Sequence, residues 1–245
     1  PLEWGSGTKI WMIYEKFIRN AAGMGKASRE PDPDKYEHAH DFCDVLVVGS
    51  GPAGIAAALK AAEHKLDVIL VEQDSDLGGS YLSEDSKNLK NKISDLKNAG
   101  VRILLRTTVF GLYDSGVAGL LERVSDHKAV KSKYEPRQRF WTVRSRHTIV
   151  ATGAFERHIA FGNNDLPGIM SASSVDIYLN RFSILAGKKI VVCTNNDSAY
   201  STAIKLANSG AEVKLIDARS SVGSVLTENA LNSGVFVKMN AAPFQ

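Results

Sequence analysis

The most regular apolar pattern in the chain begins after Asp44 and predicts alternating strand and helix. Val45 to Val48 is a short run, rich in β-branched residues, of the kind that forms a buried parallel strand. A turn containing glycines follows, and an alanine-rich segment that starts near Pro52 predicts a helix. Val68 to Val71 is a second such run, and Glu72 closes it. The pattern predicts a strand, a turn, a helix and a parallel strand with an acidic end.

Apolar side chains at helical spacing predict an amphipathic helix over residues 10–22. The side chains that indicate it are Trp11, Tyr14, Phe17, Ile18 and Ala21. Two prolines then favour an extended polar linker that runs to His40. We expect His38 and His40 on its surface, because no third ligand residue lies near them in the sequence to complete a metal site.

Turn signals in close succession predict antiparallel hairpins over about residues 106–146. A helix over residues 88–99 and a third parallel strand over residues 101–105 precede this segment. We interpret the hairpins as a β-meander inserted between parallel strands. A short strand, Thr148 to Val150, is expected to follow and to end at Ala151.

A second strand, helix and strand period begins at Lys188. The pattern predicts strands over residues 189–193, 213–216 and 235–239 and helices over residues 198–208 and 226–232. Asp217 follows the second of these strands, as Glu72 does in the first unit. The turn from Thr194 to Ser198 has no glycine, and Asp197 would repel a phosphate. We expect this turn to have lost ordinary dinucleotide binding.

These elements predict an α/β protein with a Rossmann-like FAD/NAD(P)-binding fold, which combines a central parallel sheet, an antiparallel β-meander insertion and a second, smaller βαβ nucleotide-binding-like unit. We expect an N-terminal helix and proline-containing linker over residues 1–42. A dinucleotide-binding domain over residues 43–185 and a C-terminally incomplete second unit over residues 186–245 follow. The chain begins without Met and ends directly after a strand-like segment, so we expect a piece of a longer polypeptide or a processed product.

Composition narrows the class of protein. Lys and Arg number 30 and Asp and Glu number 27, and a net charge of +3 is too small to indicate a nucleic-acid partner. Apolar runs are of strand length and no leader pattern opens the chain, so we expect no membrane span and a cytoplasmic location. Cys43 and Cys193 are far apart beside strand residues, which fits reduced thiols and excludes a Cys-x-x-Cys dithiol site.

The glycines of the first turn predict a dinucleotide site. Gly49 allows the tight turn, Gly51 lets the backbone approach a pyrophosphate, and Gly54 lets the helix pack on the strand. The phosphates would rest on the helix N-terminus at Pro52 and Ala53, where amide groups and the helix dipole favour negative charge.

Glu72 lies about twenty residues beyond the turn, where a carboxylate accepts the ribose hydroxyls of an adenosine. It would repel a 2′-phosphate, so NAD is expected rather than NADP. FAD remains an alternative, because the same turn and acid accept the ADP half of either cofactor. Further candidate contacts follow Glu72 and the later strand: Gln73, Gly78, Gly79, Ser80, Ala151, Thr152 and Gly153.

Five stretches carry a resemblance to a known family: residues 14–27, 30–34, 151–157, 164–170 and 194–200. They are similar to the α subunit of heterotetrameric sarcosine oxidase, within the two-dinucleotide-binding-domain flavoprotein superfamily. The similarity covers nearly the whole chain. The glycine motif and Ala151-Thr152-Gly153 are general to the superfamily, whereas the N-terminal helix and the glycine-free second turn are more particular.

This resemblance implies an oxidative demethylase of N-methylated glycine. It implies subunits that carry FAD, an FMN at a subunit boundary, and NAD bound to the α subunit at the candidate residues named above other than Gln73 and Ser80. Amine oxidation itself would belong to a partner subunit. The α chain of the family is also much longer, with a small ferredoxin-like domain before this region and a folate-binding region after it.

The residues themselves provide no nucleophile with an adjacent base, no paired carboxylates and no metal-ligand cluster, so we assign no catalytic or metal-binding residue. The fragment alone is expected to be inactive. Two alternatives to an NAD-binding subunit remain open. One is a self-contained FAD-binding oxidoreductase of the pyridine nucleotide type, and the other is a dinucleotide-binding module without catalysis.

Overall fold

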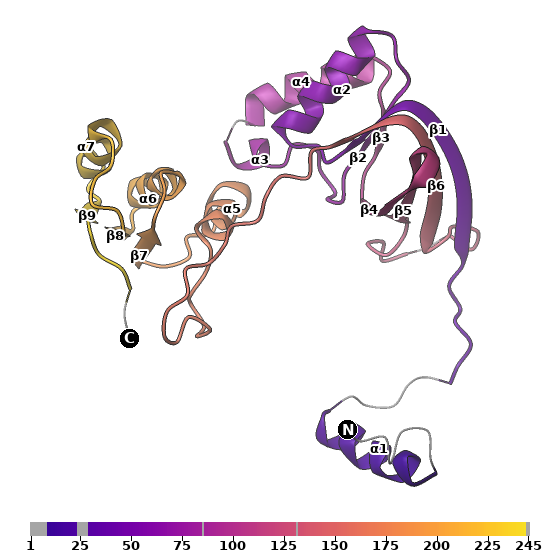
Figure 1. The fold of residues 1–245 in the computed structure, drawn as a ribbon, viewed down its shortest axis with the longest axis horizontal. Coiled ribbons are helices and arrows are strands. Elements are labelled where there is room, and N and C mark those ends of the chain that lie inside the picture. The colour runs from indigo at the N-terminus through magenta and orange to yellow at the C-terminus, as the bar shows by residue number, and fades with distance from the viewer. Residues whose placement is uncertain (1–8, 24–28, 85, 131, 244–245) are drawn as a thin grey trace. The chain divides into compact units, whose positions relative to one another are not determined.

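The computed structural model describes residues 9–23, 29–84, 86–130 and 132–243, which form two compact units. The described residues up to Lys35 belong to the first unit, and those from Tyr36 onward belong to the second. In the first unit, helix α1 (Lys9–Ala21) confirms the predicted amphipathic helix (Figure 1). Glu15 and Arg19 form an ion pair one turn apart on it. Its apolar side chains Trp11, Tyr14, Phe17 and Ile18 are exposed.

A six-stranded sheet forms the framework of the second unit (Figure 1). The strand order is β3-β2-β1-β6-β5-β4, in which β3, β2, β1 and β6 are parallel and the last two pairs are antiparallel. The predicted α/β class with a mostly parallel sheet is confirmed. The strands are β1 Tyr36–Val48, β2 Val68–Val71, β3 Arg102–Leu104, β4 Thr107–Tyr113, β5 Val117–Arg123 and β6 Gln138–Val150.

Strands β1 and β6 are longer than the sequence predicts. Strand β1 begins at Tyr36, inside the segment expected to be linker through residue 42. Strand β6 joins the last strand of the expected meander to residues 148–150 in one continuous element. The two strands pair in parallel from Tyr36 opposite Gln138 to Val48 opposite Val150. The expected linker end at residue 42 and the expected break before Thr148 are therefore wrong.

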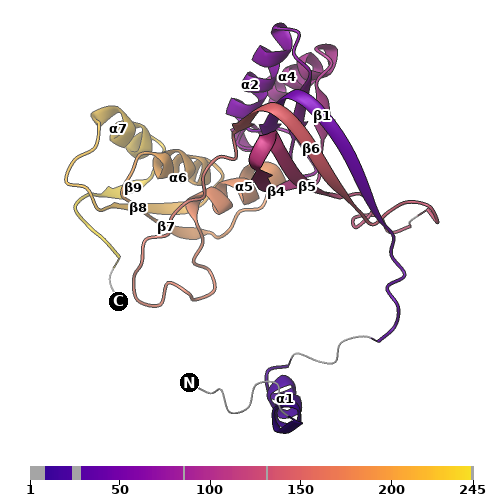
Figure 2. The same cartoon turned by 45° about the vertical axis from the view of Figure 1, so that its right-hand side comes forward.

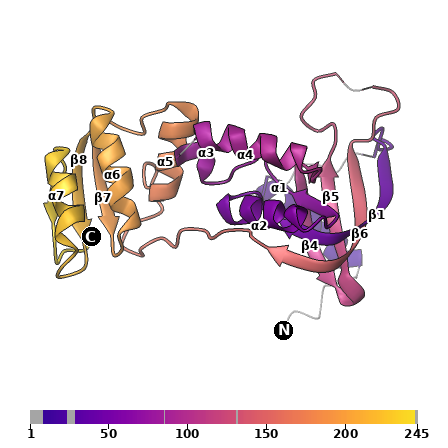
Figure 3. The same cartoon turned by 90° about the horizontal axis from the view of Figure 1, so that it is seen from above.

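Side chains of the central strands are buried on both faces of the sheet. On one face, Val47 and Leu70 belong to a cluster with residues of α2 (Pro52–Glu63) and α4 (Ser86–Asn98). On the other face, Leu46 and Ile69 pack with residues of β5 and β6. Figures 1 and 3 show α2 and α4 side by side. Strands buried on both faces read as continuous apolar runs, which is why β1 and β2 stand out in the sequence.

Three parallel strands in the order β7-β8-β9 form a smaller sheet in the same unit (Figure 2). The elements around it are β7 Lys189–Thr194, β8 Glu212–Asp217, β9 Phe236–Lys238, α5 Ala172–Phe182, α6 Ser198–Asn208 and α7 Ser224–Asn232. Tyr200, Leu206 and Leu215 lie in its core. The sequence predicts these elements except α5. Among the described residues, no helix combines the length and hydropathy needed to cross a bilayer.

Candidate functional site

Two glycines of the turn after β1 are required by the packing of the chain itself. Gly49 has a φ of 97°, and a Cβ at this position would lie 2.5 Å from the carbonyl oxygen of Ala151. A Cβ on Gly54 would lie 1.8 Å from the carbonyl oxygen of Gly49. Both side chains are excluded because the turn packs against the first turn of α2 and against the end of β6.

Gly51 differs from its neighbours. Its φ of −65° and ψ of −178° suit any residue, and among the described residues, apart from its two neighbours in the chain, no heavy atom would lie within 4 Å of a Cβ at this position. Gly51 is the N-cap of α2, with Pro52 next to it, and without a side chain it cannot cap the amides of the first helical turn. Open space before a helix N-terminus is what a bound phosphate requires.

A buried hydrogen-bond network ties the turn to the acid after β2. Oε2 of Glu72 accepts hydrogen bonds from the amide of Ser50 at 2.9 Å and from its hydroxyl at 2.6 Å. Oε1 of Glu72 accepts from the amide of Asp74 at 2.9 Å. The hydroxyl oxygen of Ser50 accepts from the amide of Gly78 at 3.1 Å. Ser50 therefore connects the first turn, the acid and the glycine pair.

Ser50 is absent from the site residues that the sequence predicts, although it is fully buried. The signal that could have identified it is a hydroxyl residue between two glycines, in the turn that follows a buried strand. A buried hydroxyl needs a partner, and the acid at the end of the next strand is the nearest candidate in this topology.

Glu72 is only 9% exposed and already accepts three hydrogen bonds. A carboxylate accepts about four hydrogen bonds in total. One acceptor position, on Oε1, therefore remains for a ligand. The sequence leads us to expect that Glu72 accepts both ribose hydroxyls, whereas the count of hydrogen bonds leaves one acceptor position.

The structure brings the other predicted residues to the same edge of the sheet. Gly79, with a φ of 53°, backs onto the turn, because a Cβ there would lie 2.9 Å from Cα of Gly51. The amide of Ala151 donates to the carbonyl oxygen of Val48 at 2.8 Å, which places the end of β6 beside Gly49. The outer members of the predicted set are exposed: Ala53, Gln73, Ser80, Thr152 and Gly153.

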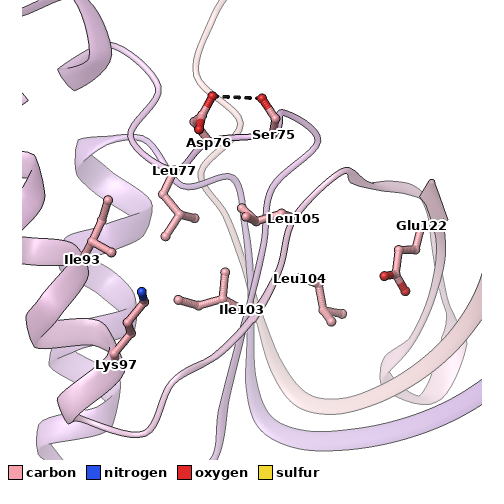
Figure 4. Close-up of a pocket in the computed structure, with 9 residues that line it drawn as sticks. All are labelled: Ser75, Asp76, Leu77, Ile93, Lys97, Ile103, Leu104, Leu105 and Glu122. Atoms are coloured by element: carbon pink, nitrogen blue, oxygen red, sulfur yellow. Dashed lines mark hydrogen bonds between the residues drawn. The ribbon is translucent and has the colours of Figure 1, made fainter. Parts of the chain in front are cut away.

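A separate pocket of about 470 Å³ is lined by residues of α4, β3 and β5 and of the loop after Glu72 (Figure 4). Figure 4 shows Leu77, Ile93 and Ile103 grouped on one side of it and Glu122 on the other. Its lining shares residues 75–77 with the loop after Glu72 but includes neither Glu72 nor Gly51. We therefore do not assign this pocket to the phosphate or ribose of a dinucleotide.

Both cysteines are free thiols. Burial raises the pKa of the Cys43 thiol to about 11, and burial also raises the pKa of Cys193. Thiols with raised pKa values are protonated at neutral pH and are poor nucleophiles. The expectation of reduced cysteines in or near the core is consistent with this chemistry.

The sequence places the chain in a known family. The sequence profile of the family described as pyridine nucleotide-disulphide oxidoreductase matches residues 43–243. The chain belongs to this family. The match extends from the strand before the glycine turn through the second, smaller sheet, so both strand and helix units are part of the family's architecture.

Two relatives of this chain at about 40% identity are named sarcosine oxidase subunit alpha. The one from Rhizobium meliloti (strain 1021) is 40% identical over 227 residues, which are 87% of this chain and 23% of the relative. The one from Corynebacterium sp. (strain P-1) is 39% identical over 226 residues, which are 88% of this chain and 23% of the relative. The resemblance inferred from the sequence is confirmed, and the chain spans about a quarter of the length of these relatives.

Solved structures of other oxidoreductases share the fold. L-proline dehydrogenase from P. horikoshii superposes with a TM-score of 0.59 at 23% identity, over 78% of this chain and 38% of the dehydrogenase chain. At this level of identity the similarity concerns the arrangement of helices and strands. It agrees with the Rossmann-like architecture expected from the glycine turn and from the second strand and helix period after Lys188.

In this member of the family, Asp217 at the end of β8 accepts hydrogen bonds from the protein's own groups. Oδ2 of Asp217 accepts from the hydroxyl of Tyr200 at 2.9 Å and from Nη2 of Arg219 at 2.8 Å. Oδ1 accepts from the amide and Nε of Arg219. Asp217 is fully buried and accepts four hydrogen bonds, so it has no acceptor position left for a ribose.

Charge at the second turn is balanced in the same way. Nη1 of Arg219 donates to Oδ1 of Asp197 at 2.7 Å, so this cation serves both acids. Burial would raise the pKa of Asp217, but hydrogen bonds from Arg219 and Tyr200 outweigh it and lower that pKa. A pocket of about 1240 Å³ lies beside the turn, and its lining includes Thr194, Asn195 and Asn196 but not Asp217.

Proposed function

We propose that the chain binds NAD across the glycine turn, with the pyrophosphate over Gly51 and the adenosine ribose at Glu72. The main support is the open space at Gly51. The chain's own packing explains glycine at positions 49 and 54 but gives no reason for glycine at position 51. The residues predicted to hold the pyrophosphate and the ribose also converge through Ser50.

Charge on the loop after β2 favours NAD over NADP. Glu72, Asp74 and Asp76 place three carboxylates within five residues. Arg181 pairs with Asp74 and Asp76, which leaves Glu72 as the acid that a ligand would meet at the end of β2. A 2′-phosphate there would face carboxylate oxygen, whereas a ribose hydroxyl would donate to the remaining position on Oε1.

We further propose that this NAD-binding chain works as part of a sarcosine oxidase-like complex that demethylates sarcosine or a related N-methyl amine. The two relatives at about 40% identity support this assignment. Oxidation of the amine is assigned to a partner subunit, with FMN at a subunit boundary. No catalytic residue is assigned to this chain, whose role is to bind and position the dinucleotide. Two free thiols fit a cytoplasmic location.

Mass spectrometry of the protein purified under native conditions, with any companion chains, tests the proposal. The expected result is NAD released on denaturation and companion subunits in the intact assembly. Release of FAD, with Gly51→Ala abolishing its retention, would support the alternative of FAD in the same site. A preparation that neither retains nor binds an adenine dinucleotide would contradict the proposal.

A further inference from the structure

The loop that carries Glu72 is fixed by contacts from outside the first strand and helix unit. The amide of Thr107 donates to the carbonyl oxygen of Glu72, and the amide of Arg106 donates to that of Asp74. Nη2 of Arg123 donates to the carbonyl oxygen of Gln73 at 2.6 Å. These contacts hold the backbone of the loop on the side of the six-stranded sheet.

Arg181 on α5 holds the other side of the loop. Its Nη1 donates to Oδ2 of Asp74 at 2.6 Å, and its Nη2 donates to Oδ2 of Asp76 at 2.9 Å. The side chain of Arg181 is 24% exposed, so the pair is partly shielded from water. The hydrogen bond from Arg181 is the main cause that lowers the pKa of Asp74. One planar guanidinium thus engages two carboxylates, a geometry that a lysine cannot reproduce.

Asp74 links Arg181 to Glu72. Asp74 accepts from Arg181 through its side chain and donates its own amide to Oε1 of Glu72 at 2.9 Å. Oε1 is the oxygen that keeps a free acceptor position. Any shift of Asp74 would therefore move the atom that is proposed to meet the ribose.

Helix α5 is in turn anchored to the smaller sheet. Nζ of Lys205 on α6 donates to Oδ1 of Asp176 on α5 at 2.8 Å. Helix α5 also packs against α3 (Tyr81–Glu84), which follows the glycine pair (Figure 3). The segment from Glu72 to α3 is therefore in contact with α5 at both of its ends.

We propose that Arg181 is a positioning residue for the dinucleotide site, which fixes Oε1 of Glu72 through Asp74 and so sets the affinity for the adenosine ribose. This inference rests on the proposed function, because it assigns a role at the same site. It adds that helix α5, outside the glycine turn and its acid, controls how well that acid binds a ligand.

Calorimetric titration of the full natural protein, after removal of any bound nucleotide, tests the proposal with two probes. One probe is NAD, and the other is NAD whose adenosine ribose lacks both hydroxyls. Arg181→Met should weaken NAD binding about threefold to tenfold and leave the affinity for the dideoxy probe nearly unchanged. Arg181→Lys should recover only part of the loss.

Two further variants sharpen the test. Asp74→Asn removes the carboxylate that pairs with Arg181 but keeps the backbone amide that donates to Glu72. It should weaken NAD binding as much as Arg181→Met does. The double variant should show no further loss. Arg146→Met removes an exposed arginine that pairs with Asp44, away from the loop, and serves as the matched control. It should leave both affinities unchanged.

The outcomes separate this inference from the proposed function. Equal loss for both probes in Arg181→Met, or no loss for NAD, overturns the positioning role while NAD binding by the unaltered protein stands. Absence of NAD binding by the unaltered protein, or full affinity in Gly51→Ala, removes the proposed function and this inference with it.

Discussion

At the scale of single residues, the three glycines of the first turn are glycine for different physical reasons. Gly49 and Gly54 are excluded from carrying a side chain by carbonyl oxygens at 2.5 and 1.8 Å from the position of a Cβ. Gly51 is free of such contacts and has an ordinary backbone conformation. The sequence predicts a different role for each glycine, and the packing of the chain accounts for glycine at positions 49 and 54 but not at position 51.

Gly51→Ala should therefore separate binding from folding. Reduced flexibility of the unfolded chain stabilises the variant by about 0.4–1 kcal/mol, and the poorer N-cap offsets this, so the thermal midpoint should barely change. Dinucleotide affinity should fall at least about tenfold, because the methyl group occupies the space of the pyrophosphate. Thermal denaturation and calorimetric titration measure the two effects.

Gly54→Ala is the matched control for this variant. The added methyl group would meet the Gly49 carbonyl oxygen, so the free energy of unfolding should fall by more than about 3 kcal/mol. Undiminished affinity in Gly51→Ala would count against the placement of the pyrophosphate.

Glu72→Gln should reduce stability as well as binding. The amide group of glutamine accepts hydrogen bonds through one atom only, so its NH₂ must face a donor, either on Ser50 or on Asp74. A buried donor left without an acceptor costs about 1–3 kcal/mol. Chemical denaturation should show this loss together with weaker NAD binding. An unchanged denaturation midpoint would mean that the network contributes little to folding.

At the scale of secondary structure, local patterns predict some elements to the residue and miss others. Helix α6 is predicted over its full length, because Ala199, Ala203 and Leu206 recur at helical spacing. The first half of β1 is missed because Tyr36 to Asp41 is mostly polar and mostly exposed, and only its pairing with the distant strand β6 makes it extended. Long-range pairing of this kind leaves no local signal.

Helix α5 shows the opposite case, in which a signal exists and is easily missed. Ser171 caps the helix by accepting from the amide of Ser174, and Val175, Tyr178 and Leu179 follow at helical spacing. Glycine at positions 49 and 54 could be predicted from the sequence, because the packing of the turn excludes a side chain there. Arg181 could not, because its importance depends on a contact with Asp74, 107 residues away.

The link between α6 and β8 has a pH dependence that can be measured. Burial, together with the neighbouring Asp217, raises the pKa of Tyr200 to about 12, from a usual value of about 10. A group with a raised pKa stabilises the fold below pH 10 and loses this contribution as pH rises toward 12. Thermal midpoints of the protein should fall across this window more steeply than those of Tyr200→Phe. Parallel curves would show that Tyr200 is not the group that titrates.

At the scale of the molecule, the second unit contains two similar strand and helix arrangements with different capacities. Each has its own hydrophobic cluster, and each ends its second strand in a buried acid. Glu72 keeps an acceptor position, whereas Asp217 has none. Under the proposed function, the same architecture holds a ligand at the six-stranded sheet, whereas the acid of the smaller sheet is satisfied by the protein's own side chains. Arg181 on α5 joins the two regions through its contact with Asp74.

Hydrogen exchange of the intact protein should show this asymmetry directly. A ligand at about 100 times its Kd stabilises the binding-competent state by about 2.7 kcal/mol, which slows exchange of the amides it orders by roughly a hundredfold. With NAD, peptides that cover residues 45–54 and 72–80 should gain this protection, because the amides of Ser50 and Gly78 belong to the network around Glu72. Peptides that cover residues 194–200 and 212–219 should change little, because Asp217 is closed to a ribose. Protection confined to the second pair of peptides would place the dinucleotide at the smaller sheet and contradict the assignment to Gly51 and Glu72.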